Sequence, residues 1–187
     1  MFHWTDILCL GYLGFELFLL ATRRGKVAAK SADRGTIKAA WALILGSCLA
    51  GFFLVRHITV LNWPPHSPVI ISVAILLEVG GVALRIWAIR HLGRFFTVDV
   101  GIQQGHHVIQ DGPYRFVRHP SYSGSLLALT GVGCLTFNWL GLILIVGCTL
   151  CAYAIRIPVE EKTLLAELGT EYEKYAARTK RMIPGIY

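Results

Sequence analysis

The sequence has little charge and none of the short motifs that identify many soluble enzymes. Only 16% of its 187 residues are charged, 55% are hydrophobic, and the mean hydropathy is +0.56. It has no phosphate-binding G-x-x-x-x-G-K-[ST] loop, no G-x-G-x-x-G after a strand, no H-E-x-x-H and no G-x-S-x-G. It also has no internal repeat. These absences exclude the usual signatures of nucleotide-binding enzymes, zinc proteases and serine hydrolases, and the composition is not that of a soluble domain.

The cysteines lack the partners that a metal or redox site needs. Cys148 and Cys151 form a C-x-x-C, but without a nearby His or further Cys they are only neighbours on one helical turn. We interpret all of them as small buried side chains and expect no metal site. All five lie within apolar runs: Cys9, Cys48, Cys134, Cys148 and Cys151.

Apolar runs long enough to cross a bilayer recur along the chain, since about 20 residues span a hydrocarbon core of roughly 30 Å. They cover residues 4–21, 39–55, 68–89, 122–137 and 139–157. Only Asn138 separates the last two, which must form a tight hairpin. The first run has no Lys or Arg before it and is interrupted by Asp6 and Glu16, so we expect a retained helix rather than a cleaved signal peptide. The sequence predicts an all-α integral membrane protein with about five transmembrane helices.

The distribution of Lys and Arg predicts the orientation. Six lie in segment 22–38, four in segment 90–121 and six from Arg156 onward, whereas the loops on the other side hold only Arg56. The positive-inside rule then places the N-terminus outside and the C-terminus in the cytoplasm. The net charge of +7 follows this topological pattern, so we expect a membrane surface and not nucleic acid as the partner.

We predict one integrated domain, with an N-terminal three-helix membrane region (1–92) and a second region (93–187) made of a loop, the hairpin and a cytoplasmic tail. Ser67-Pro68 is suited to begin the third helix. Pro158 is suited to begin a short tail helix, and Gly169 to end it before a second one capped by Thr170. The tail either lies on the bilayer or forms a lid over segment 90–121.

Charged side chains gather where the hairpin meets the cytoplasm. Arg118 and His119 precede the fourth span, where free N–H groups attract anions, and Arg156 and Glu160 follow the fifth. The hairpin must bring these residues and Tyr122 together. Two interpretations remain open: cations that snorkel toward lipid phosphates, and a site that holds one specific anion such as a carboxylate.

The C-terminal half resembles the isoprenylcysteine carboxyl methyltransferase family. The resemblance rests on GHHVIQDGPYRFVRHPSYSG at residues 105–124, RIPVEE from Arg156, then GTEYEKY and RMIPGI, and it covers about residues 93–186. One difference is that Val108-Ile109 stands where the family has Leu-Val, which preserves an apolar pair.

The resemblance implies a membrane-embedded enzyme at the cytoplasmic interface. It would methylate the carboxylate of a lipid-like or isoprenylcysteine-type substrate that enters from the bilayer, using S-adenosylmethionine and releasing S-adenosylhomocysteine. Arg156 would face the substrate, and Glu160 would act in catalysis and in cofactor binding. The other implied cofactor residues are His106, His107, Val108, Ile109, Tyr114, Arg118, His119, Pro120, Ser121 and Tyr122.

Other functions remain open from the sequence. One is a phospholipid or small-molecule methyltransferase, for which His107 or Glu161 could accept a proton. Another is an NADPH-dependent enzyme resembling the sterol reductases, and a third is a membrane scaffold without catalytic activity. Within the third span, Glu78 and Arg85 lie on roughly the same helix face, and we expect either a loose structural pair or an Arg85 that reaches the cytoplasmic pocket.

Overall fold

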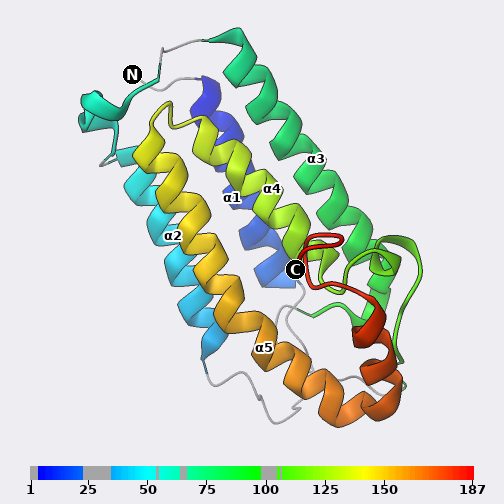
Figure 1. The fold of residues 1–187 in the computed structure, drawn as a ribbon. Coiled ribbons are helices and arrows are strands. Elements are labelled where there is room, and N and C mark those ends of the chain that lie inside the picture. Colours follow the sequence, from blue (N-terminus) through cyan, green and yellow to red (C-terminus); the bar gives the residue numbers. More distant parts are fainter. Residues whose placement is uncertain (1–3, 23–34, 54, 64–66, 98–104, 106) are drawn as a thin grey trace.

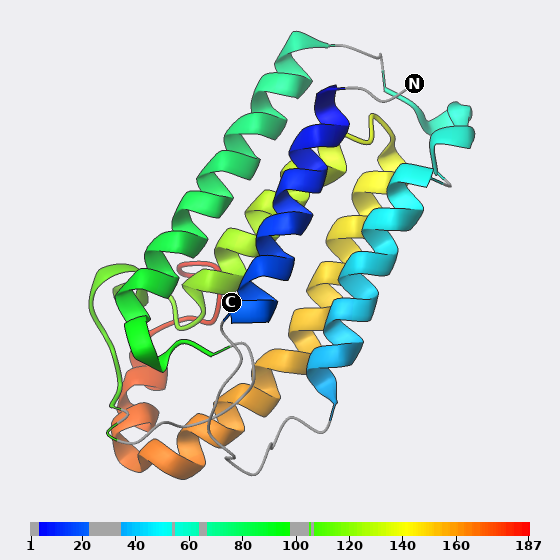
Figure 2. The same ribbon diagram turned by 180° about the vertical axis from the view of Figure 1, so that it is seen from behind.

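In the part of the chain that the structure describes, five α-helices form a bundle, which Figures 1 and 2 show from opposite sides. The computed structural model describes residues 4–22, 35–53, 55–63, 67–97, 105 and 107–187. No β-strand occurs within these ranges, so the all-α prediction is confirmed. The helices are α1 (Trp4–Thr22), α2 (Thr36–Phe53), α3 (Pro68–Leu92), α4 (Pro120–Cys134) and α5 (Trp139–Arg178). Four short 3₁₀ turns lie between them: η1 (Val55–His57), η2 (Thr59–Leu61), η3 (Gly93–Phe95) and η4 (Gly112–Arg115).

Among the described residues, three helices are long and apolar enough to cross a membrane. They are α2, α3 with the turn that follows it, and α5, with mean hydropathies of 1.6, 2.2 and 2.2 over their most apolar windows. The α4 helix has 15 residues and is therefore about 22 Å long, shorter than a hydrocarbon core. It begins two residues before the predicted span and ends three residues earlier. The number of crossings stays a prediction.

Small residues set the distance between α3 and α4. A Cβ on Gly81 would lie 2.5 Å from the Gly124 carbonyl oxygen, and one on Gly124 would lie 2.7 Å from the backbone nitrogen of Arg85. Gly131 meets Ala74 and Glu78 in the same way, so the two backbones touch along much of their length. Close approach through small residues is the usual basis of helix packing in membranes.

Gly81→Ala should push α3 and α4 apart and destabilise the bundle by about 1–3 kcal/mol, the usual cost of overpacking. The matched control is Gly80→Ala on the same helix, where an added Cβ meets nothing within 4 Å. We expect this control to be neutral or slightly stabilising because alanine favours helix. Thermal unfolding in detergent measures both variants. Equal melting temperatures for the two would contradict the close contact.

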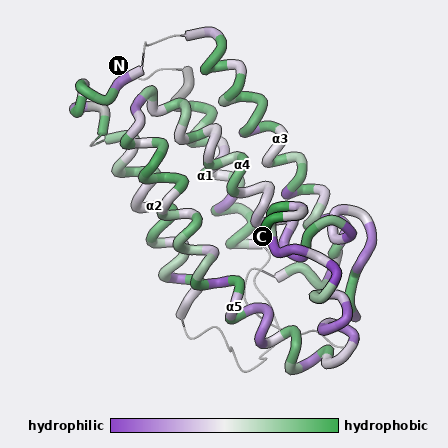
Figure 3. Tube along the Cα trace, viewed as in Figure 1, coloured by the Kyte–Doolittle hydropathy of each residue, from purple (hydrophilic) through white to green (hydrophobic). Residues whose placement is uncertain are grey.

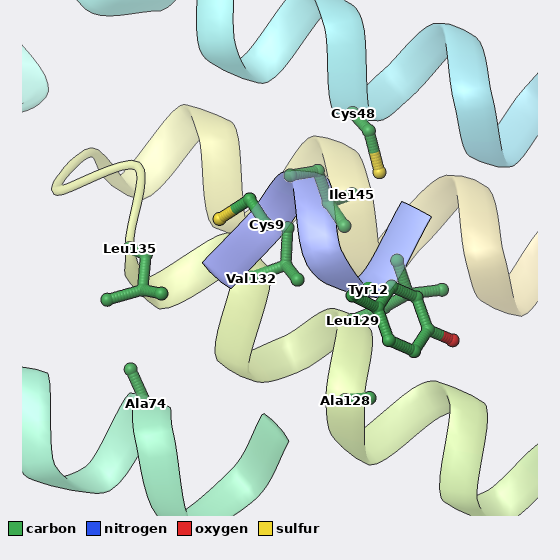
Figure 4. Close-up of a cluster of buried hydrophobic side chains, with 9 residues drawn as sticks. All are labelled: Cys9, Tyr12, Cys48, Ala74, Ala128, Leu129, Val132, Leu135 and Ile145. Atoms are coloured by element: carbon green, nitrogen blue, oxygen red, sulfur yellow. The ribbon is translucent and has the colours of Figure 1, made fainter. Parts of the chain in front are cut away.

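Apolar packing fills the centre of the bundle, and polar segments gather at one end. Residues from all five helices meet in the cluster drawn in Figure 4, including Cys9, Cys48, Ala74, Leu129 and Ile145. Large apolar side chains such as Leu76 and Ile143 are exposed on the outside. Figure 3 shows hydrophobic colouring along the helices and hydrophilic colouring where α5 bends into the tail.

Asn138 links the start of α5 to the segment after α2, at the end of the bundle away from the tail. Its side-chain oxygen accepts from the backbone N–H groups of Leu140 and Gly141 and so caps α5. Its side-chain nitrogen donates to the Ile58 carbonyl at 2.8 Å and to Asn62 Oδ1 at 2.6 Å. The predicted hairpin is therefore present, with the turn spanning residues 135–138, and it is tied to the segment that follows α2.

The helix that carries the tail differs from the prediction. Pro158 does not begin a new helix, because α5 continues through it. Proline inside a helix removes one hydrogen bond and favours a bend, and the orange part of α5 turns away from the bundle in Figure 1. The break predicted at Gly169 is present: its φ of 55° and ψ of −134° are not helical. Ser67 precedes α3 as expected but makes no side-chain cap.

Candidate functional site

A cavity that opens to the outside lies at the end of the bundle that carries the tail. Polar and aromatic side chains from α4, α5, segment 107–109 and the tail line it, and we call this set the charged chamber. Apolar side chains of α1 and α2 line the same cavity, and we call this set the apolar arm: Leu13, Ile37, Trp41, Ile44 and Leu45. One cavity is thus bordered by both charged and apolar side chains.

Tyr122 and Glu160 form the centre of the charged chamber. The Tyr122 hydroxyl donates to Glu160 Oε2 at 2.7 Å. The guanidinium of Arg156 lies within hydrogen-bonding reach of the same hydroxyl and donates to Thr36 Oγ1 at 3.1 Å. Arg156 is only 4% exposed, so its charge acts in a site largely screened from water. The structure thus brings together the residues that the sequence placed at the two ends of the hairpin.

Three rings stack along one wall. The His119 and Tyr122 rings are 5.5 Å apart with 19° between their planes, and Tyr122 and Tyr153 are 4.7 Å apart with 24° between theirs. His119 Nδ1 lies 3.8 Å from Glu160 Oε1. This wall offers flat aromatic surface beside a carboxylate, a combination that suits cationic or planar ligand groups. Tyr153 was not predicted from the sequence.

Glu161, for which the sequence suggested only a possible proton acceptor, is the hub of an ionic cluster. It accepts from Arg118 at 2.8 Å and Arg181 at 2.9 Å, and it lies 3.3 Å from His119 Nε2. Burial raises the pKa of this carboxyl group, but the hydrogen bonds from His119, Arg181 and Arg118 outweigh burial and lower its pKa to about 2. Arg118 also donates to the carbonyls of Ala176 and Thr179, so the structure gives this predicted cofactor residue partners within the protein.

Three of the four residues in the predicted His-His-Val-Ile element line the cavity, and the fourth lies outside the described residues. Val108 and Ile109 line the cavity, and the Val108 N–H points at Glu171 Oε1, 3.4 Å away. His107 also lines it, although its side chain is exposed and packs edge-on against Phe95. His106 lies outside the described residues.

The first turn of α4 and η4 hold the remaining predicted residues. Tyr114 lines the cavity and its hydroxyl donates to the Ala88 carbonyl at 3.3 Å; burial raises its pKa. Ser121 lines the cavity, whereas Pro120 is fully buried and does not.

The tail covers the chamber. Leu164, Leu168, Tyr172 and Tyr175 line the cavity, and both tyrosines are buried. The Tyr175 hydroxyl donates to the Tyr114 carbonyl at 2.7 Å. The Tyr172 hydroxyl finds no hydrogen-bond partner among the described residues, which is costly for a buried group and leaves it available to a ligand. Of the two expected arrangements of the tail, a cover over the preceding loop fits these contacts.

The expected pair within α3 is not formed. Arg85 Nη2 lies 2.7 Å from Glu16 Oε2 on α1, while Glu78 Oε2 has no hydrogen-bond partner in the described part of the chain. Glu78 and Arg85 are seven residues, or two helical turns, apart on α3. Glu16 on α1 lies closer to Arg85 and pairs with it instead. The second expectation holds, because Arg85 reaches the cavity wall.

Known proteins resemble this chain in both sequence and fold. The family model described as isoprenylcysteine carboxyl methyltransferase (ICMT) matches residues 73–166. A probable protein-S-isoprenylcysteine O-methyltransferase of Oryza sativa subsp. indica is 32% identical over 116 residues, 61% of each chain. Protein-S-isoprenylcysteine O-methyltransferase B of Arabidopsis thaliana is 33% identical over 108 residues, 57% of this chain and 55% of the plant protein.

Two further matches extend over more of the chain. Protein-S-isoprenylcysteine O-methyltransferase of Saccharomyces cerevisiae is 27% identical over 173 residues, 91% of this chain and 68% of the yeast protein. A solved structure of the eukaryotic intramembrane Ras methyltransferase ICMT superposes with a TM-score of 0.61 at 21% identity, covering 86% of this chain and 55% of that one. The chain spans about three fifths of the length of the plant relatives it matches.

Proposed function

Because this chain belongs to the isoprenylcysteine carboxyl methyltransferase family, the family expected from its sequence, we propose that it transfers a methyl group from S-adenosylmethionine to the carboxylate of a lipophilic substrate. The observation that carries this proposal is that the charged chamber and the apolar arm border the same cavity. Such a space suits two different molecules, one polar and one greasy, that must meet at one point.

The residues of the chamber fit the methyl donor. S-adenosylmethionine carries a sulfonium, an ammonium and a carboxylate, so its pocket needs both signs of charge and flat surface for the adenine. Glu160 supplies the negative charge, and the rings of His119, Tyr122 and Tyr153 supply the surface. The orphaned Tyr172 hydroxyl supplies a hydrogen bond to an acceptor on the ligand. The donor provides an activated methyl group and leaves as the neutral thioether.

Arg156 presents the acceptor. A carboxylate with a pKa near 4 is ionised at neutral pH, so the reaction needs no general base. One oxygen of the carboxylate forms the new bond to the methyl carbon as the carbon–sulfur bond breaks, which gives an ester. The protein must align the three atoms and remove water from the carboxylate. A buried guanidinium can do this through two parallel hydrogen bonds to the carboxylate.

We place the charged chamber at the cytoplasmic face, with the N-terminus outside. The Lys and Arg distribution supports this orientation, and the polar end of the bundle is also the end where the tail lies (Figure 3). The polar donor then enters from the cytosol, and the greasy substrate enters from lipid between α1 and α2.

Ligand-dependent stability tests the proposal. At a hundredfold excess over its Kd, a ligand adds about 2.7 kcal/mol to the stability of its binding state. We expect S-adenosylmethionine and S-adenosylhomocysteine to raise the melting temperature of the detergent-purified protein, and NADPH to leave it unchanged. Labelled methyl transfer to an N-acetylated prenylcysteine, with its methyl ester as control, then tests the acceptor. Stabilisation by NADPH alone would instead support a reductase.

A further inference from the structure

A polar cluster joins α1 to α3 and α4 beside the cavity. Glu16 accepts from Arg85 at 2.7 Å and from the Tyr12 hydroxyl at 2.7 Å, and that hydroxyl lies 2.7 Å from Ser125 Oγ. Arg85 also donates to the carbonyl and to the hydroxyl of Ser121, at 3.0 and 3.2 Å. All five residues line the cavity, and Glu16 and Arg85 are 5% and 8% exposed.

Stability alone does not explain this arrangement. Two charges buried among apolar helices are costly to desolvate, and well-packed apolar side chains of similar size often hold helices together equally well. Arg85 Nε is buried without a hydrogen-bond partner in the described structure, so the cluster is not even fully satisfied. The Glu16–Arg85 pair fixes the position of α1 relative to one turn of α4, which a non-directional apolar contact does not do.

That turn carries the site. Ser121 lies between His119, which faces the two glutamates, and Tyr122, which holds Glu160. The other wall of the apolar arm is α2, which packs against α5 and reaches Arg156 through Thr36. The distance between α1 and α2 therefore depends on how α1 is held. Arg85 fixes the position of α1 relative to the turn of α4 that lies beside the proposed reaction site.

We propose that Glu16, Arg85 and Tyr12 are positioning residues for the lipophilic substrate: together they hold α1 as the lipid-side wall of the apolar arm. This inference rests on the proposed function for its substrate. The cofactor side does not depend on the pair, because the turn is also held by backbone hydrogen bonds from Arg118 and His119 to Lys180 and Arg181. Loss of the pair should thus weaken binding of the lipophilic substrate and leave binding of the methyl donor unchanged.

The test uses the full chain in detergent or lipid nanodiscs. A single substitution leaves an unpaired buried charge, which is strongly destabilising. The main variant is therefore the double change Glu16→Leu/Arg85→Met, with Tyr12→Phe as a milder one. Glu78→Leu is the matched control, because it removes a buried carboxylate of α3 that does not line the cavity. Hydrogen exchange of the α1 amides reports the wall independently of any activity.

We expect the double variant to exchange its α1 amides about tenfold faster or more, with α3 and α4 unchanged. Its KM for a prenylcysteine should rise about tenfold, with kcat and the Kd for S-adenosylmethionine within about threefold of the parent. Tyr12→Phe should change KM in the same direction by less, and Glu78→Leu should match the parent.

Unchanged exchange in α1, or an unchanged KM, would overturn the inference. So would loss of S-adenosylmethionine binding by a folded double variant, since the pair would then serve the cofactor side. If the parent chain itself transfers no methyl group, the proposed function fails. The α1 exchange rates, together with displacement of a fluorescent fatty acid from the arm, still decide whether the pair holds the wall.

Discussion

Arg156→Leu should lower kcat/KM for methyl transfer by about a hundredfold to several thousandfold, because two charge-assisted hydrogen bonds to the acceptor carboxylate are together worth roughly 3–5 kcal/mol. S-adenosylmethionine binding should stay nearly intact, since in the proposed mechanism the guanidinium binds the acceptor and not the methyl donor. Arg156→Lys keeps the charge but loses the two-pronged geometry, and it should recover only part of the rate. Steady-state kinetics and calorimetric titration with the methyl donor separate the two effects.

The partner substitution distinguishes the roles within the chamber. Glu160→Gln keeps an acceptor for the Tyr122 hydroxyl but removes the negative charge, so it should weaken binding of the cationic donor more than it changes the KM of the acceptor. Arg115→Leu is the control, because Arg115 is exposed and does not line the cavity. If Arg156→Leu and Arg115→Leu lowered kcat/KM equally, Arg156 would have no specific role in the reaction.

Glu161→Gln should release the tail and destabilise the protein by about 1–3 kcal/mol, the usual cost of leaving partly buried hydrogen-bonding groups without a partner. Three cationic or potentially cationic groups converge on this carboxylate, and two of them, Arg118 and His119, sit beside α4, while Arg181 belongs to the tail. Limited proteolysis of the tail and thermal unfolding both report the change. Glu173→Gln, at an exposed carboxylate of the same tail, should have almost no effect.

Acid should reproduce the same loss in the parent chain. The folded-state pKa of Glu161 is about 2, below its usual value of 4.5, so the carboxylate stabilises the fold fully above pH 4.5 and progressively less as the pH falls toward 2. Tail proteolysis should therefore increase over this range, and the increase should be absent from Glu161→Gln. An acid transition of equal size in both chains would show that another group is responsible.

Local patterns predicted the helices, and chain connectivity predicted part of the site. Because so few residues separate α4 from α5, Arg156 and Glu160 had to emerge beside His119 and Tyr122. The limits of the apolar runs placed the start of α1, α3 and α5 correctly. The sequence did not predict the continuation of α5 through Pro158, since a proline that begins a helix and one that bends a helix have the same local appearance.

Contacts between distant helices could not be predicted in the same way. Glu16 and Arg85 are 69 residues apart, and nothing in the loops says that α1 lies against α3 and α4 at that height. Glu160 and Glu161 are neighbours in sequence, but adjacent helical residues point about 100° apart. One therefore faces Tyr122 in the chamber and the other faces the arginines, a division that depends on the rotation of α5 and not on residue type.

The contacts of Asn138 fix the start of α5, at the end of the bundle opposite the cavity. A tilt of α5 about this fixed point would displace residues at the cavity end of the helix. Arg156 lies 18 residues along α5 from Asn138, or about 27 Å away, so a tilt of only about 5° moves it by about 2 Å. A shift of that size is enough to break a two-pronged contact with a carboxylate. Because helix tilt responds to bilayer thickness, we expect the lipid composition of the membrane to act most strongly on this end of α5, where the proposed reaction site lies.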